Sequence, residues 1–317
     1  MPGTPAGHPP AQPGNTPAEE ATRVFLAHRE LLFSVVYDML GTVTDTEDVL
    51  QETWVAWAAR AQDPAAGEIT SPRAYLVRVA VNRALAQQAS ISRRREEYPG
   101  PWLPEPLVTE DRAEDGAGAV ERAESVSLAM LVVLETLTPL ERAVFVLHEV
   151  FGYAHAEIAG IVERSPAAVR QIDHRAREHV HARRPRYRAD PRVQRQATER
   201  FLAAAVGSDL DALMRVLAPD VTLWADGGGR APAAGPHPVH GRGKVARIIV
   251  AGSLRSPIPD MGIRYGSING EPAAVLTSGG APYMVISLDV DPEDGRVRGV
   301  YVVTNPGKLA HLGGAGS

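Results

Sequence analysis

Residues suited to bind a nucleic acid are concentrated between Arg164 and Arg188. This stretch holds eight arginines against two acids, although the whole chain has a formal net charge of -5. Guanidinium groups pair with phosphate oxygens, and Arg and Gln side chains also read guanine and adenine edges in the major groove. The side chains that we expect to contact DNA here are Arg170, Gln171, His174, Arg175 and Arg177.

Two short helices joined by a tight turn are expected to present these side chains. The first helix is predicted over 153–162, and Ser165-Pro166 fits the cap and first position of the second. Four apolar residues recur at helical spacing along one face of that second helix: Val169, Ile172, Ala176 and Val180. The pattern predicts a helix-turn-helix, whose second helix can enter a major groove. The alternative is an ordinary amphipathic pair with a solvated basic side.

Two further helices upstream carry polar faces that could bind partners. Ser71-Pro72 opens a predicted helix over 73–89, and the side chains available off its apolar side are Arg73, Arg78, Asn82 and Arg83. Before it, Thr44 and Glu47 fit a capping box for a helix over 48–57. That helix turns an acidic, hydrogen-bonding face outward, formed by Asp48, Gln51 and Glu52. The alternative for this acidic face is simple solvation.

Composition limits the class of protein. A chain of 317 residues with 44% hydrophobic content suits two or three domains with real cores. No apolar run approaches the length of a membrane span, so no membrane partner is expected. Cysteine is absent, which excludes disulfides and thiolate metal sites and favours the cytoplasm as compartment. We expect no cofactor and no metal.

The order of predicted elements divides the chain. Residues 1–18, rich in Pro, Gly and Ala, are expected to be a disordered tail, and 96–124 an acidic, Pro-rich linker. Helices are predicted over 125–137 and 140–150, ahead of the helix-turn-helix. Beyond residue 192, helices over 193–206, 210–217 and 243–253 are joined by strands over 221–224, 262–268, 273–278, 283–290 and 296–303. Ala218-Pro219-Asp220 is expected to close the second of these helices. Helices followed by an antiparallel run predict an α+β domain.

Three stretches in this order resemble a bacterial sigma factor of the extracytoplasmic-function group. The stretch 45–53 is similar to the core-binding helix of sigma region two, and 72–83 to its promoter-melting helix. The stretch 137–145, with the helix-turn-helix, is similar to sigma region four. The resemblance implies a region two domain over 19–95 and a region four domain over 125–185, with core RNA polymerase and promoter DNA as partners.

The resemblance also implies roles for the candidate residues. Asp48, Gln51 and Glu52 would dock on polymerase. Arg73, Arg78, Asn82 and Arg83 would contact the −10 element, with Asn82 and the loop 63–69 holding an unstacked base. Arg170, Gln171, His174 and Arg175 would read the −35 element, while Arg177, Arg183 and Arg184 would hold phosphate.

The remainder, 192–312, resembles the SnoaL-like domain of the NTF2-like fold, an α+β cone that one sigma subgroup carries at its C-terminus. Three motifs support this: Trp-Leu-Pro-Glu-Pro at 102–106, Asp-Gly-Gly-Gly-Arg at 226–230 and Asn-Pro-Gly-Lys-Leu at 305–309. Arg230 replaces the Lys of the family pattern, and Gly307 replaces an Asp. We expect the motifs to pack together and set the spacing of regions two and four. The residues of this expected regulatory contact are Trp102, Leu103, Pro104, Asp226, Gly228, Arg230, Asn305, Pro306, Lys308 and Leu309.

Two other functions remain open from the sequence. Some SnoaL-like domains are enzymes, and Asp226, His237 and His240 could belong to a catalytic pocket, although we expect no enzyme. The chain could also be a ligand-responsive regulator that binds operators without polymerase. The C-terminal domain could hold an unknown small ligand, and the sequence leaves open whether the domain activates or inhibits.

Overall fold

The computed structural model describes residues 16–63, 67, 69–109, 126–182, 189–229 and 235–314. Within these ranges, no helix combines the length and apolar character needed to cross a membrane. Of the expected tail, residues 1–15 lie outside the described ranges. Thr16 caps the first helix, and Pro17 begins it, so the last two residues assigned to the tail are helical in the structure.

The first helical body consists of α1 (Pro17–Leu40), α2 (Val43–Gln62) and α3 (Pro72–Glu96). Gly41 ends α1 in the left-handed conformation and donates its N–H to the carbonyl of Tyr37. The predicted cap at Ser71 is confirmed, since its side chain accepts from the N–H of Ala74. The predicted capping box of Thr44 and Glu47 is wrong. α2 already begins at Val43, and both residues lie within its first turns.

The second helical body consists of α4 (Leu128–Leu134), α5 (Pro139–Phe145), a π-helical turn η1 (Val146–Val150), α6 (His155–Ile161) and α7 (Pro166–His181). The predicted helix-turn-helix is confirmed as α6 and α7, with Ser165 capping α7. Glu163 turns the chain between them with a φ of +53°. The predicted helix over 125–137 is shorter, and the one over 140–150 changes to π-helical geometry after Phe145.

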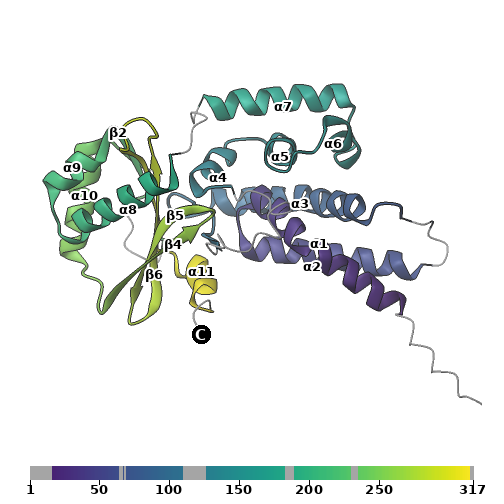
Figure 1. Ribbon diagram of the computed structural model, residues 1–317, viewed down its shortest axis with the longest axis horizontal. Helices are drawn as coiled ribbons and strands as arrows, with labels where there is room; N and C mark the ends of the chain where they lie inside the picture. The colour runs from purple at the N-terminus through teal and green to yellow at the C-terminus, as the bar shows by residue number, and fades with distance from the viewer. Residues whose placement is uncertain are drawn as a thin grey trace, which may run out of the picture.

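The two helical bodies share one hydrophobic core. Its buried side chains come from α1, α2 and α3 and equally from α5, α6 and α7, with Leu32, Leu76, Leu147 and Ile158 fully buried. Figure 1 shows α5, α6 and α7 stacked over α3, with α1 and α2 on the other side of α3. The C-terminal body lies beside both.

The C-terminal body is a seven-stranded sheet in the order β1-β4-β5-β6-β7-β2-β3 with three helices. The strands are β1 (Val108–Thr109), β2 (Leu217–Asp226), β3 (Val239–His240), β4 (Met261–Ile268), β5 (Glu271–Ser278), β6 (Ala281–Val290) and β7 (Val297–Val303). The helices are α8 (Pro191–Val206), α9 (Leu210–Val216) and α10 (Arg242–Arg255). Short helical turns, α11 (Pro306–Leu309) and η2 (Ala310–Gly314), follow β7.

Three differences from the predicted elements of the C-terminal body stand out. Ala218-Pro219-Asp220 does not close a helix, because it lies inside β2, where the pairing with β7 shifts register between Leu217 and Thr222. β2 and β7 also run parallel, whereas the other neighbouring strands are antiparallel as expected. In addition, β1 comes from the predicted linker and forms the edge of the sheet beside β4.

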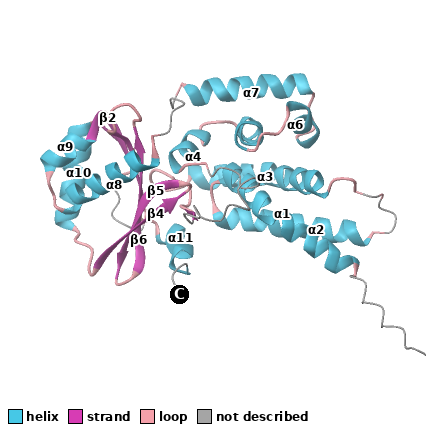
Figure 2. Ribbon diagram, in the orientation of Figure 1, coloured by secondary structure: helices cyan, strands magenta, loops and turns pink. Residues whose placement is uncertain are grey.

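The sheet buries a different core on each face. Along β5, Ala274 and Leu276 pack toward α8, α9 and α10, which cover one face of the sheet (Figure 2). The alternate residues Ala273 and Val275 belong to a separate cluster with Leu103, Leu128 and Leu309 on the other face. Successive side chains of a strand point to opposite faces of the sheet. The second face therefore packs the C-terminal body against the linker and α4.

Candidate functional site

Helix α7 presents a polar row away from the shared core. Ser165 and Pro166 start the helix, and Val169 and Ala176 are fully buried beneath it. The expected DNA-reading side chains Arg170, Gln171, His174 and Arg175 are all exposed on the opposite side. This geometry would allow them to reach base edges and phosphates in a major groove.

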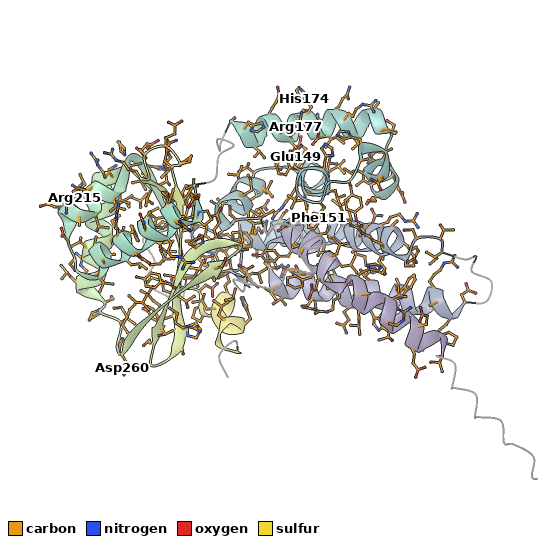
Figure 3. The ribbon with its side chains drawn as sticks, viewed as in Figure 1. Glu149, Phe151, His174, Arg177, Arg215 and Asp260 are labelled. Atoms are coloured by element: carbon orange, nitrogen blue, oxygen red, sulfur yellow. The ribbon has the colours of Figure 1, made fainter. Side chains whose placement is uncertain are left out.

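Two ion pairs involve the polar residues of α7, one on its exposed side and one turned toward the rest of region four. His174 Nε2 lies 3.5 Å from Glu178 Oε1 within the exposed row. Arg177 is half-buried and turns toward Glu149, with 3.4 Å between Nη1 and Oε1. Figure 3 shows His174 on the outer side of α7 and Arg177 on the side of Glu149. Arg183 and Arg184, expected to hold phosphate, lie outside the described residues.

The expected −10 surface on α3 is partly covered by the helix-turn-helix. Asn82 donates from Nδ2 to the carbonyl of Ile161 in α6, at 3.1 Å. The guanidinium carbon of Arg73 lies 5.7 Å from the ring centre of Tyr153. Arg78 remains exposed over Tyr75. The structure therefore places Arg73 and Asn82 against the second helical body, and only part of this surface is free. Of the loop 63–69, residues 64–66 and 68 lie outside the described residues.

The expected polymerase-docking face on α2 is exposed. Asp48, Gln51 and Glu52 all point to solvent, while Val49, Leu50 and Thr53 are buried between them. Glu52 also accepts from Arg83 of α3, with 2.5 Å between Oε2 and Nη1. Both side chains are largely solvated, so such a pair contributes at most about 1 kcal/mol and can open when a partner binds.

Asp226, at the end of β2, is where the three motifs meet. Its side chain is 0% exposed and accepts four hydrogen bonds. Oδ2 accepts from the N–H of Leu103 at 2.9 Å and from Lys308 Nζ at 2.7 Å. Oδ1 accepts from the Tyr98 hydroxyl at 2.5 Å and from the N–H of Gly228 at 3.1 Å. One carboxylate thus joins the linker, the glycine turn and the C-terminal tail.

Trp102 lies between two cations at this junction. The guanidinium carbon of Arg95 is 3.7 Å from its ring centre, and Lys308 Nζ is 4.1 Å from it. Lys308 also donates to the carbonyl of Leu103. Cations over an indole face are attracted by its quadrupole, most strongly where water is excluded. Trp102 therefore connects the end of α3 to the C-terminal tail.

The glycine turn permits close approach of the tail. Gly228 has a φ of +59°, and a Cβ there would lie 2.5 Å from Asn305 Nδ2. That amide donates to the Tyr98 hydroxyl, and Pro306 then begins α11. The buried residues of this group are Leu103, Pro104, Lys308 and Leu309. Arg230, which replaces the Lys of the expected motif, lies outside the described residues.

Comparison with known proteins identifies the family of this chain. Models of sigma-70 region 2 and sigma-70 region 4 match residues 24–94 and 127–180. The ECF RNA polymerase sigma factor SigJ of Mycobacterium tuberculosis is 37% identical over 293 residues, which are 90% of this chain and 92% of SigJ. The chain belongs to the extracytoplasmic-function (ECF) sigma factors.

The similarity to ECF sigma factors extends past the two helical bodies. The crystal structure of M. tuberculosis SigJ matches with a TM-score of 0.70 at 33% identity, covering 91% of this chain and 98% of that one. The probable ECF sigma factor SigI of M. tuberculosis is 29% identical and covers 91% of this chain and 96% of SigI. The expected fold class is confirmed as two helical sigma domains followed by an α+β body.

Several residues of this sigma factor's interdomain contacts were missed by the sequence analysis. Asn269, 1% exposed, donates from Nδ2 to the Tyr37 hydroxyl at 2.8 Å and accepts from the N–H of Leu107 at 3.1 Å. Glu105 accepts from the N–H of Val43 at 2.7 Å. Their partners are distant in sequence, and a turn Asn carries no local signal of such contacts. Glu105 lies inside the Trp-Leu-Pro-Glu-Pro motif but was not among the residues expected to make the contact.

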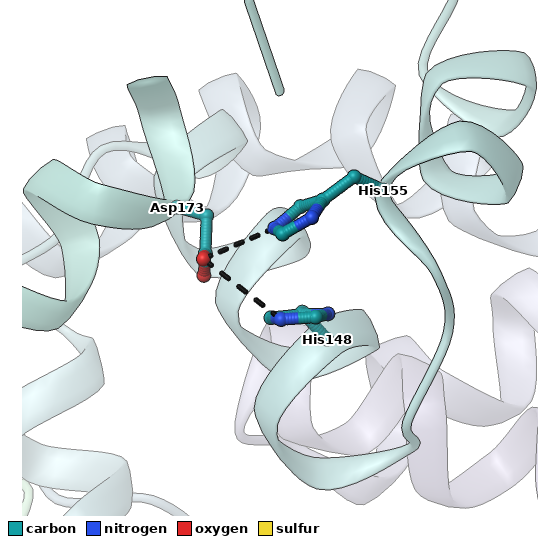
Figure 4. A group of neighbouring side chains, drawn as sticks. All are labelled: His148, His155 and Asp173. Carbon is teal, nitrogen blue, oxygen red and sulfur yellow. Dashed lines mark hydrogen bonds and ion pairs between the residues drawn. The ribbon is translucent and has the colours of Figure 1, made fainter. Parts of the chain in front are cut away.

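A second polar cluster lies under the recognition helix of this sigma factor. His148 from η1, His155 from α6 and Asp173 from α7 face one another (Figure 4). Asp173 Oδ2 lies 3.2 Å from His155 Nε2 and 4.0 Å from His148 Nε2. The sequence analysis assigned no role to these three residues, because their spacing along the chain matches no common ligand motif.

Proposed function

We propose that this chain directs RNA polymerase to promoters and that its own C-terminal domain sets the relative placement of sigma regions two and four. The family assignment supports the first half. The Asp226 junction carries the second half, because one buried carboxylate binds the linker that follows region two and also the tail of the C-terminal domain. The site of action would be the cytoplasm, where promoter DNA lies.

Docking on polymerase is assigned to the exposed face of α2. Asp48, Gln51 and Glu52 suit a basic surface of the core enzyme, because two carboxylates and an amide can accept hydrogen bonds from Arg and Lys. The −35 element is assigned to α7. Bidentate contacts of Arg with guanine and Gln with adenine each contribute roughly 1–3 kcal/mol of discrimination, which suits Arg170 and Gln171.

Contact with the −10 element is assigned to Arg73, Arg78, Asn82 and Arg83, but it requires a change in the free protein. Asn82 is hydrogen-bonded to Ile161, and Arg73 lies over Tyr153, so region four occupies part of the surface that DNA would use. Regions two and four must separate before a flipped −10 base can reach Asn82. The structure described here would then be a closed form of the sigma factor.

The C-terminal domain contacts both of the bodies that must separate. Asn269 reaches Tyr37 of α1, while Leu128 and Ala129 of α4 pack in the same cluster as Val275 and Leu309. These contacts support a role in holding the closed form. Loosening them should change how readily the −10 surface becomes available.

A catalytic role for the C-terminal domain has less support. Asp226 is completely buried with four donors, whereas His237 and His240 are both exposed. The three therefore do not face a common pocket. A hollow beside α8, lined by Arg195, Thr198 and Tyr265 among others, has a volume of only 60 Å³. Pockets for small ligands are typically about 300–1,000 Å³, so this hollow gives little support to a bound ligand.

Transcription with purified core polymerase tests both halves of the proposal. Full-length protein should protect a promoter only when core enzyme is present. Trp102→Ala should alter promoter output, since it removes the aromatic face between Arg95 and Lys308, and Trp102→Phe should alter it less. Unchanged output from Trp102→Ala would contradict the regulatory half. Failure to associate with core polymerase at low ionic strength would contradict the sigma assignment itself.

A further inference from the structure

We propose that His148, His155 and Asp173 form a binding site for one divalent transition-metal ion inside region four, with Zn²⁺ the best chemical match. Two imidazoles and one carboxylate are a donor set that Zn²⁺ uses, whereas Mg²⁺ and Ca²⁺ prefer oxygen ligands alone. The three side chains come from η1, α6 and α7, so a bound ion would connect the recognition helix to both elements that support it.

The donor atoms already have nearly the spacing that a metal requires. One donor atom from each side chain lies within 4.8 Å of the other two. His155 Nε2 and Asp173 Oδ2 are 3.2 Å apart, and His148 Nε2 and the same oxygen are 4.0 Å apart. Bonds of about 2.0–2.2 Å in a tetrahedral site place neighbouring ligand atoms roughly 3.3–3.5 Å apart. Both imidazole rings point toward the carboxylate (Figure 4).

The carboxylate has an oxygen without a protein partner. Asp173 is 3% exposed, and its Oδ1 makes no hydrogen bond within the described part of the chain. A buried polar atom without a partner is costly and uncommon in folded proteins. A metal ion at the cluster would supply the missing interaction.

The surroundings of His148 resemble the outer shell of metal sites. Its Nδ1 lies 2.8 Å from the carbonyl oxygen of Tyr153, which fixes the proton on Nδ1 and leaves the Nε2 lone pair facing Asp173. His148 stands on the π-helical turn, a geometry often found at functional sites. The His148 and His155 side chains are 27% and 28% exposed, so a water molecule can enter as a fourth ligand.

One cation lies near the cluster and must be considered. Arg177 Nε is 3.9 Å from Asp173 Oδ2, but Arg177 also pairs with Glu149 at 3.4 Å and is 40% exposed. A long, partly solvated side chain can keep the Glu149 pair while a metal occupies the carboxylate. The competing explanation is a hydrogen bond between His155 and Asp173 that fastens α6 to α7 without any ion.

Metal titration of the tag-free full chain tests the site. After chelation and dialysis, Zn²⁺ should bind with one-to-one stoichiometry by calorimetry, and Co²⁺ should give the visible bands of tetrahedral coordination. Zn²⁺ should also raise the melting temperature of the helical part of the chain. His155→Gln and Asp173→Asn should each weaken binding at least about tenfold, since each removes a ligand. His181→Gln, at an exposed position of the same helix, should bind as the unaltered chain does.

The outcomes separate the metal site from a simple hydrogen bond. Loss of binding in the folded ligand variants, with retention in His181→Gln, supports the site. Binding that persists in both ligand variants would place the ion at other histidines and overturn the proposal, as would no binding by the unaltered chain at 100 μM Zn²⁺, about a hundredfold above a micromolar dissociation constant. Circular dichroism before titration identifies folded variants, and His148→Gln provides a third independent test of the same ligand set.

Discussion

Asp226 accepts hydrogen bonds from Tyr98, Leu103, Gly228 and Lys308 while completely removed from solvent. Only an ionised carboxylate offers enough acceptor positions for four donors, because an Asn in the same place would turn an N–H₂ group toward one pair of them. Removing the charge would also leave the buried ammonium of Lys308 unpaired, a change that typically costs about 3–5 kcal/mol. The motif therefore requires Asp at this position.

Lys308 should make the free energy of unfolding depend on pH. Burial lowers the pKa of Lys308 to about 8, although Asp226 attracts its charge and acts in the opposite direction. In the unfolded chain the ammonium has its ordinary pKa, roughly 10.4. Between these values the unfolded chain binds more protons than the folded one, so the free energy of unfolding increases with pH across this window.

Comparison with a variant isolates this contribution. Relative to Lys308→Met, the free energy of unfolding of the unaltered chain should rise by about 1 kcal/mol between pH 7.5 and 9. Urea denaturation at several pH values in that range measures the difference. Parallel pH profiles for the two proteins would show that Lys308 keeps an ordinary pKa in the folded state and contradict the prediction.

The sequence located this junction only through family motifs. Resemblance singled out Trp102, Asp226 and Lys308, and the structure brings them into contact. Tyr98 and Asn269 had no such signal, because a tyrosine in a linker and an asparagine in a hairpin are ordinary on local grounds. Their roles come from partners 128 and 232 residues away, Asp226 and Tyr37.

Among the elements, the turn of the β4–β5 hairpin also contacts α1 and the linker. Asn269 and Gly270 form its two-residue turn with φ values of +52° and +73°. The same Asn269 side chain binds Tyr37 of α1 and the N–H of Leu107, just before the edge strand β1. The turn therefore fastens the C-terminal sheet to region two and to the linker at one point.

Replacing this asparagine with glycine separates its role in the turn from its side-chain hydrogen bonds. Asn269→Gly accommodates the positive φ but removes both side-chain hydrogen bonds, so we expect a loss of about 1–3 kcal/mol in the free energy of unfolding. Tyr37→Phe should cost a similar amount, because its hydroxyl also donates to the carbonyl of Glu105, while Asn269 retains its contact with Leu107. In the double variant the two losses should be clearly less than additive. Full additivity in urea denaturation would mean that the hairpin is weakened independently of Tyr37.

The start of α2 shows why element boundaries were harder to predict than elements. Thr44 and Glu47 satisfied the local capping pattern, but the helix begins one residue before Thr44. The N–H of Val43 is instead capped by the side chain of Glu105, which lies 62 residues further along the chain. A local pattern cannot reveal a cap supplied by tertiary contact. Caps satisfied within their own helix, such as Ser71 and Ser165, were predicted correctly.

At the scale of the whole molecule, the two surfaces proposed to read DNA differ in accessibility. Arg170 and Gln171 on α7 are exposed, while Asn82 on α3 is hydrogen-bonded to α6. Regions two and four share one core, and the C-terminal body adds a second contact with each of them. On the proposed assignments, the free protein presents its −35 face but not its complete −10 face. The proposal then requires that binding to polymerase and promoter supply the free energy that separates the regions.

This opening can be measured because the chain contains no cysteine. Cysteines introduced at the exposed positions Ala61 in α2 and Ala182 after α7 can carry a donor and an acceptor dye without competing labelling. Energy transfer should fall from its free-protein value when core polymerase and promoter DNA are added. Asp226→Asn should lower the transfer efficiency already in the free protein, because it releases the linker between the two regions. As a control, Val55→Ala, a change at an exposed apolar side chain of α2, should leave the free-protein value unaltered. Equal transfer with and without polymerase would mean that regions two and four stay packed during initiation, and Asn82 could then not be the residue that reads the −10 base.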